Sequence, residues 1–137
     1  MGGIQFIVWK DEYGVGHSEL DAHHRHLIEV INTLYEIATA GASETQLDEM
    51  MREIDAYAIR HFQTEEEILA GSGYPHLSQQ QKAHEAYVRK VDELKRSFFL
   101  PVGGLSQEIL QFLKNWWLTH IVMMDKEYSA YVSTPPD

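Results

Sequence analysis

The amino-acid sequence predicts an all-α protein, an up-down-up-down four-helix bundle with an irregular N-terminal arm. Apolar residues recur with a period close to 3.6 in four separate segments, each of about 20 to 28 residues. Capping or helix-breaking residues bound these segments, and the loops between them are short, about 2 to 8 residues. No part of the 137-residue chain shows the two-residue alternation that is typical of a half-buried strand.

The four predicted helices follow one another with clear boundaries. Their expected ranges are residues 18–40, 43–70, 78–98 and 105–131. Each of the first three opens with a serine that has an acid or amide three residues later, the pattern of a capping box; the pairs are Ser18 with Asp21, Ser43 with Gln46 and Ser78 with Gln81. Helix-ending glycine or proline follows them, in Gly41, GSGYP and PVGG.

The whole chain, residues 1–137, is expected to form a single domain, because its length suits one hydrophobic core. Residues 1–16 are expected to form the irregular arm, with Trp9 packed on the bundle. Residues 132–137 contain prolines that cannot continue a helix. This end is equally consistent with a frayed tail and with the start of a linker to a downstream module.

The composition excludes several classes of function. The net charge of −10 argues against binding to nucleic acid or to an anionic membrane surface. The chain has no cysteine, so disulfides, thiolate metal sites, iron–sulfur clusters and cysteine nucleophiles are excluded. No apolar run is long enough to span a membrane, and the N-terminus lacks the pattern of a secretory signal, so a cytoplasmic location is expected.

Histidine is unusually frequent, with eight copies against 11 lysines and arginines. Several histidines and two other polar residues fall on helix faces that are otherwise apolar: His24, His61, Glu65, Gln80, His84 and His120. Burying one such group without a partner costs roughly 1 to 3 kcal/mol. A lone core histidine is usually satisfied by a backbone carbonyl or a hydroxyl, but a set of this size is best satisfied around a metal ion.

Spacing along the helices supports a metal site. His61 and Glu65 are four residues apart, so one helix face offers a nitrogen and an oxygen to the same centre. His120 and Asp125 are five residues apart, about 140° around an ideal helix, so their convergence requires a long reach or a local π-bulge. By spacing alone, Asp125 is equally consistent with a solvated acid.

Regular helical periodicity gives two further expectations for the surroundings of these residues. It places Met123 and Tyr131 on the inner face of the fourth helix. It also turns Glu66 and Glu67 towards solvent, since each successive residue is rotated by about 100° from the one before it.

Histidine and carboxylate ligands without thiolates suit iron, zinc or manganese. Two carboxylates able to bridge, with several imidazoles around them, indicate two metal ions. No histidine of this sequence has a glutamate three residues before it, so the Glu-x-x-His motif of ferritin-like bundles is absent. The His-Glu-x-x-His motif of zinc proteases is also absent. The predicted site is therefore richer in nitrogen than a ferritin-like one.

These motifs resemble those of the hemerythrin family in its bacterial form. FIVWKDEYGVGHSELDAHH is similar to the family's entry arm and first-helix motif, and HFQTEE to its His-Phe-x-x-Glu-Glu motif. GYPHLSQQQKAHEAY resembles the third-helix motif, and WWLTHIVMMDKEY resembles Trp-x-x-x-His-Ile-x-x-x-Asp-x-x-Tyr. The resemblance covers nearly the whole chain and implies six metal ligands: His24, His61, Glu65, His84, His120 and Asp125.

The resemblance also implies a non-haem di-iron centre, oxo- or hydroxo-bridged, that binds O2 or a small anion. By this resemblance His24 and His61 serve the O2-binding iron, His84 and His120 serve the other, and Glu65 and Asp125 bridge them. Three further residues are expected to line the pocket beside the ligands: His23, Tyr87 and Trp116. Some family members are stand-alone oxygen binders, and others are domains of chemoreceptors or diguanylate cyclases.

Two positions depart from the family pattern. His23 stands where the family usually has a glutamine, and on an ideal helix it points about 100° away from His24, so it is expected to be a neighbour of the site. Gln80 stands where the third helix should carry the first of two histidines. His76 lies another turn back, about 12 Å along the axis from His84, too far to substitute. Gln80 is therefore either a weak ligand or a buried amide hydrogen-bonded to a group around the ligands, beside an iron that accepts exogenous ligands.

A less complete ligand set at one iron favours redox or oxygen sensing over storage. The function expected first is therefore that of a sensory di-iron domain, with a possible C-terminal signalling module as its partner. A stand-alone oxygen-binding protein is the second candidate, and a di-iron peroxidase or O2 reductase is the third. No acid or base beyond the ligand set points to catalysis by the domain itself.

Overall fold

The computed structural model describes residues 6–98 and 107–132. Four long helical rods make up this part of the chain, and it contains no strand, so the predicted all-α bundle is confirmed. The first three rods are α1 (Ser18–Thr39), α2 (Glu44–Ser72) and α3 (Leu77–Phe98). The fourth combines α4 (Gln107–Thr119), the π-helical η2 (His120–Met124), η3 (Asp125–Tyr128) and α5 (Ser129–Val132).

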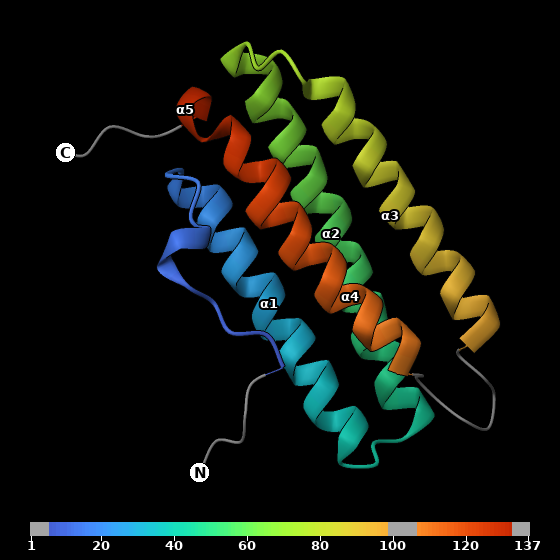
Figure 1. The fold of residues 1–137 in the computed structure, drawn as a ribbon. Helices are drawn as coiled ribbons and strands as arrows, with labels where there is room; N and C mark the ends of the chain where they lie inside the picture. Colours follow the sequence, from blue (N-terminus) through green and yellow to red (C-terminus); the bar gives the residue numbers. More distant parts are fainter. Residues whose placement is uncertain (1–5, 99–106, 133–137) are drawn as a thin grey trace.

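The rods pack in ring order. α1 contacts α2 and α4, α2 contacts α3, and α3 contacts α4. Figure 1 shows the up-down-up-down course, in which rods that follow one another in the chain lie side by side. The predicted PVGG break and the 133–137 part of the predicted tail fall outside the described residues. Within the described ranges, no helix combines the length and the apolar character needed to cross a membrane.

The helix starts follow the sequence only in part. Ser43 and Gln46 form the predicted capping box at the start of α2, with both reciprocal bonds present. Ser18, in contrast, is already inside α1, so its prediction as the cap was wrong. His17 caps this helix instead, because its Nδ1 accepts a bond from the Leu20 amide at 3.3 Å.

The N-terminal arm is fixed to the bundle by a few polar contacts. It contains one short 3₁₀ turn, η1 (Asp11–Tyr13). Asn32 of α1 pairs with the backbone of Ile7 in both directions, at 2.7 and 2.8 Å. Trp9 packs against the hydrophobic core, as predicted, and Arg25 lies over its ring at 5.6 Å.

The π-helical turn in the fourth rod changes which residues face inwards. The Asp125 amide donates to the His120 carbonyl, a bond across five residues that adds one residue to the turn. Everything after it is therefore rotated relative to a regular helix. Met123 and Tyr131 are 64% and 48% exposed, so their prediction as inner-face residues was wrong, and Tyr128 is buried instead.

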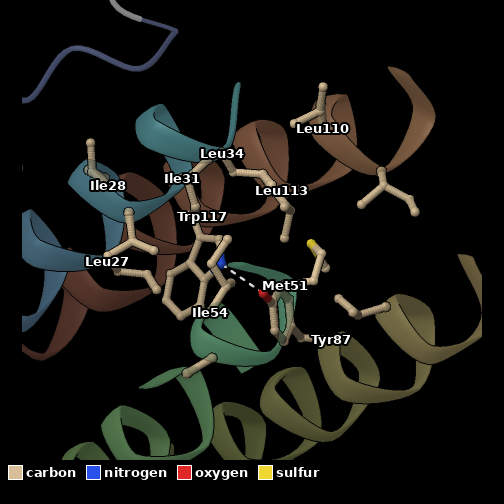
Figure 2. Packing of buried hydrophobic residues seen from close by; sticks show 14 of the residues in the cluster. Leu27, Ile28, Ile31, Leu34, Met51, Ile54, Tyr87, Leu110, Leu113 and Trp117 are labelled. Atoms are coloured by element: carbon tan, nitrogen blue, oxygen red, sulfur yellow. Dashed lines mark hydrogen bonds between the residues drawn. The ribbon is translucent and has the colours of Figure 1, made fainter. Parts of the chain in front are cut away.

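The apolar core falls into two clusters with polar residues between them. The larger cluster joins all four rods and includes Leu27, Ile31, Ile54, Leu113 and Trp117 (Figure 2). The smaller one comprises Val15, Leu20, Leu69, Tyr74, Tyr128 and Val132. Along α1, Leu20 belongs to the smaller cluster and Leu27 to the larger. The polar His24 thus lies between two apolar regions, and each buried Leu or Ile there contributes roughly 1.5 to 3 kcal/mol to folding.

Candidate metal centre

The polar layer brings all six predicted ligand residues together. Their ligand atoms form two groups, and the atoms within each group lie within 4.8 Å of one another. The first group is His24, His61, Glu65 and Asp125, and the second is Glu65, His84 and His120. All six side chains are at most 3% exposed. Glu65 belongs to both groups, so the arrangement suits two ions that share a carboxylate.

Each rod supplies its ligands through its own local geometry. On α2, the four-residue spacing brings His61 Nε2 to 3.3 Å from Glu65 Oε2. On the fourth rod, the π-helical turn brings His120 Nε2 to 3.0 Å from Asp125 Oδ1 across five residues. The local π-bulge, one of the two ways in which this spacing allows convergence, is present. Asp125 is a buried residue of the cluster, where spacing alone also allowed a solvated acid.

The two carboxylates each present one oxygen to each histidine pair. Glu65 Oε2 lies 3.3 Å from His61 Nε2 and 3.6 Å from His24 Nε2, while its Oε1 lies 2.8 Å from His84 Nε2. Asp125 Oδ2 lies 3.2 Å from His24 Nε2, while its Oδ1 lies on the His120 side. Both acids therefore stand between an α1–α2 pair of imidazoles, His24 and His61, and a second pair, His84 on α3 and His120 on η2.

Several of these atoms lie close together without forming hydrogen bonds. In the described part of the chain, His84 Nε2, His120 Nε2, Glu65 Oε1 and Asp125 Oδ2 are buried and have no hydrogen-bond partner. Lone pairs that converge in this way fit cations, and imidazole with carboxylate is a donor set that suits iron, zinc or manganese. The residues therefore fit a two-metal centre.

Charge within the cluster is shared between acids and imidazoles. Burial alone would lower the pKa of His24, but the neighbouring Asp125 and Glu65 carboxylates raise it to about 9. The pKa of His120 is likewise raised to about 10, because Asp125 outweighs the effect of burial. Burial would raise the pKa of Glu65, yet the imidazoles around it, with His61 foremost, hold it well below its usual range. Bound metal ions would replace the protons on these imidazoles, so metal binding would release protons.

The outer nitrogens of two histidines have side-chain partners. His84 Nδ1 donates to Glu66 Oε2 at 2.8 Å, and His61 Nδ1 lies 3.1 Å from His23 Nδ1. These contacts leave the Nε2 atoms turned to the cluster, as is usual for metal-binding histidines. Burial lowers the pKa of His23. If His61 offers the lone pair of Nε2 to the cluster, its proton lies on Nδ1, and His23 Nδ1 is then the acceptor. His23 is thus a neighbour of the site, as expected.

Glu66 and Tyr128 were missed by sequence reasoning. Glu66 was expected to face solvent, but its side chain is only 29% exposed and reaches sideways from α2 to His84 on α3. Tyr128 donates its hydroxyl proton to Glu65 Oε2 at 2.8 Å. The available signal was positional: Glu66 is the last acid of HFQTEE, and Tyr128 closes WWLTHIVMMDKEY, three residues after Asp125.

Aromatic rings pack on the ligands of the second group. Phe62 stacks on His84 with ring centroids 3.9 Å apart, and Trp116 stacks on His120 at 4.3 Å. Trp116 therefore lies directly against His120 of the cluster. Tyr87 is one layer further out, and its hydroxyl accepts a bond from Trp117 Nε1 at 3.1 Å (Figure 2).

Gln80 is the seventh buried polar residue and lies against the cluster. It is 1% exposed, and its Nε2 donates to Asp125 Oδ1 at 3.1 Å. Its Oε1 is buried and has no hydrogen-bond partner within the described residues. His76, one turn before Gln80, is exposed. The amide thus contacts the aspartate oxygen that faces His120.

Comparison with known proteins identifies the family of the chain. The sequence model of the Hemerythrin HHE cation binding domain matches residues 15–132. The chain belongs to the hemerythrin family. As a member, it is a hemerythrin-like di-iron-binding domain, and the buried histidine–carboxylate cluster at its centre is able to hold metal.

Relatives and solved structures agree with this family. A bacteriohemerythrin from Clostridium acetobutylicum is 33% identical over 126 residues, which cover 89% of this chain and 98% of the relative. One from Stenotrophomonas maltophilia is 30% identical over 94% of this chain and 83% of its own length. Wild-type hemerythrin has the same fold, with a TM-score of 0.84 at 22% identity over 94% of this chain and 99% of that one.

Proposed function

We propose that the domain binds O2 or a small anion at a di-iron centre and acts as an oxygen or redox sensor in the cytoplasm. The observation that carries this proposal is the placement of Glu65 and Asp125, each with one oxygen towards each histidine pair. This is the arrangement expected of two carboxylates that bridge two ions. The ligand roles follow from it.

His24 and His61 would hold one iron, and His84 and His120 the other, with both acids shared. When bound, an oxo- or hydroxo-bridged iron pair supplies redox chemistry and ligation of O2. The protein supplies orientation and exclusion of water. Tyr128 fixes Glu65 through its hydroxyl, and rings stacked on the ligands cover the second histidine pair.

Gln80 supports sensing over storage. The chain places an amide, bonded to Asp125, at the position where the family motif has a further histidine. The second iron would then have two imidazoles and shared carboxylates as its protein ligands, and iron with few protein ligands accepts exogenous ones. Such a centre would change oxidation state readily, which suits a sensor coupled to a signalling module.

Stand-alone oxygen binding is the second candidate, and one comparison favours it. The match spans 98% of the bacteriohemerythrin from Clostridium acetobutylicum, so that relative consists almost entirely of this domain. The two candidates differ in kinetics. The iron centre of a carrier releases O2 intact and oxidises slowly in air. The iron centre of a redox sensor is oxidised soon after it meets O2.

The experiment is metal analysis with absorption spectra of oxidised and reduced protein. Two irons per chain, with a spectrum that changes on exposure of the reduced form to O2, support the proposed centre. A stoichiometry near one, or zinc retained after reconstitution with iron, would overturn it. Repeated cycles of O2 addition and removal then separate the candidates, because loss of the reduced form within one cycle favours sensing.

A further inference from the structure

A cavity of about 220 Å³ lies between the start of α3 and the η2–η3 part of the fourth rod. Its lining residues are Tyr74, His76, Gln79, Gln80, Met124 and Glu127. A water molecule occupies about 30 Å³ of liquid volume, so a ligand of a few heavy atoms fits easily.

Gln80 separates this cavity from the metal centre. Its side chain lines the cavity, yet it is only 1% exposed, and its Nε2 donates to Asp125 Oδ1 on the inner side. That oxygen lies 3.0 Å from His120 Nε2. His84 is one helical turn further along α3. A molecule that passes Gln80 therefore arrives at the metal position defined by His84 and His120.

The orientation of the Gln80 amide is set by its partner. An ionised carboxylate only accepts hydrogen bonds, so the amide nitrogen faces Asp125 and the amide oxygen faces elsewhere. This Oε1 is buried without a hydrogen-bond partner in the described residues. Buried amide oxygens are normally satisfied. A ligand that carries an N–H or O–H group would satisfy this one.

The charge of the surroundings disfavours anions. Glu127 lines the cavity and is exposed, and the chain as a whole has a net charge of −10. A negative ligand would approach against this field. The chemistry of the cavity thus suits a ligand that is small, uncharged and able to donate a hydrogen bond.

The geometry points to a second ligand-binding site, at the His84–His120 metal position, that takes neutral protic molecules of two or three heavy atoms through this cavity. Gln80 closes the route and accepts the hydrogen bond of the ligand through Oε1. Hydrogen peroxide and hydroxylamine belong to this class. The inference rests on the proposed di-iron centre and adds the route, the binding residue and the ligand class.

The test compares cyanamide, which is neutral and carries N–H, with azide, which has similar length and no N–H at neutral pH. Both are titrated into the oxidised two-iron protein, and binding is followed by absorption. Gln80→Met keeps the side-chain length and removes the amide. We expect its cyanamide affinity to fall roughly tenfold, the worth of one hydrogen bond, while azide affinity changes less than threefold. Gln81→Met, on the exposed face of α3, is the matched control and should alter neither.

Two further measurements complete the test. Gln80→His should weaken both ligands, because an imidazole there occupies the position. Acetonitrile, which has the three heavy atoms of cyanamide but no N–H, should bind to the unaltered protein about tenfold more weakly than cyanamide, and this comparison needs no variant. Equal losses of cyanamide and azide affinity in Gln80→Met, or equal binding of cyanamide and acetonitrile, would overturn the inference while leaving the di-iron centre intact. Fewer than two irons in the unaltered protein would overturn the proposed function itself.

Discussion

Glu66 on α2 and His84 on α3 are joined by a 2.8 Å hydrogen bond between Oε2 and Nδ1. This bond fixes the imidazole so that Nε2 faces Glu65 Oε1, also at 2.8 Å. A carboxylate in this position orients a metal-binding histidine and makes it a stronger donor. Glu66 would therefore act on a metal ion held by His84 without touching the ion.

Replacing Glu66 by glutamine should weaken this position selectively. The amide can still contact His84 but carries no charge, so iron affinity at one of the two positions should fall about 10- to 100-fold. Titration with a competing chelator measures this as one iron lost early. Glu67→Gln, at the exposed next residue, is the control. Its chelator titration curve should match that of the unaltered protein, with both irons lost over the same concentration range. Identical chelator curves for the two variants would show that Glu66 has no such role.

The shared carboxylates should matter more than any outer residue. Glu65→Gln and Asp125→Asn each remove a charged oxygen from both histidine pairs, so we expect at least one iron per chain to be lost on desalting. Each variant leaves a single shared carboxylate to balance the positive charge of two ions. Elemental analysis after gel filtration measures the loss, again against Glu67→Gln. Full loading of either acid variant would contradict the assignment of bridging roles.

His23 should stabilise the first metal position through His61. His23→Leu removes the acceptor at 3.1 Å from His61 Nδ1, so the ring is no longer held and iron affinity should fall about tenfold. His23→Gln, the residue usual in the family, restores an acceptor and should recover most of the loss. His26→Leu, an exposed neighbour, provides the control for histidine removal. The same chelator titration measures the iron affinity of all three variants. If His23→Gln bound iron as weakly as His23→Leu, the hydrogen bond between residue 23 and His61 would have no role in iron binding.

The sequence predicted the fold, and the six residues that it singled out are buried and lie together, because periodicity and polar residues on apolar faces report burial directly. It failed where local geometry departs from an ideal helix. The π-helical turn at His120–Met124 brought Asp125 inwards, as the five-residue spacing allowed, but it also turned Met123 and Tyr131 outwards. A pattern based on 3.6 residues per turn does not account for that rotation.

Side-chain reach between helices was the second source of error. Glu66 is rotated by about 100° from Glu65 on its own helix, which alone predicts a solvated acid. Its contact with His84 depends on how closely α3 packs on α2. The pairing of Gln80 with Asp125 across 45 positions likewise depends on tertiary packing. Single-helix patterns contain no information on such distances.

Glu127 offers a test of the route past Gln80 that leaves the metal ligands untouched. It is exposed and lines the 220 Å³ cavity, so its charge opposes an entering anion. Removing one exposed charge near the path changes the interaction energy by up to about 1 kcal/mol, equivalent to a rate change of up to about fivefold. Glu127→Gln should therefore speed azide association by about two- to fivefold at low salt, with the gain shrinking as ionic strength rises.

Cyanamide is uncharged, so its association rate should be the same in Glu127→Gln and in the unaltered protein. Glu108→Gln, in the first turn of α4 and also exposed, removes the same single negative charge and controls for the overall field. Stopped-flow mixing of each oxidised protein with azide or cyanamide, at two salt concentrations, measures all of these rates. If Glu108→Gln accelerated azide as much as Glu127→Gln, the effect would come from net charge alone, and anions would enter by some route other than this cavity.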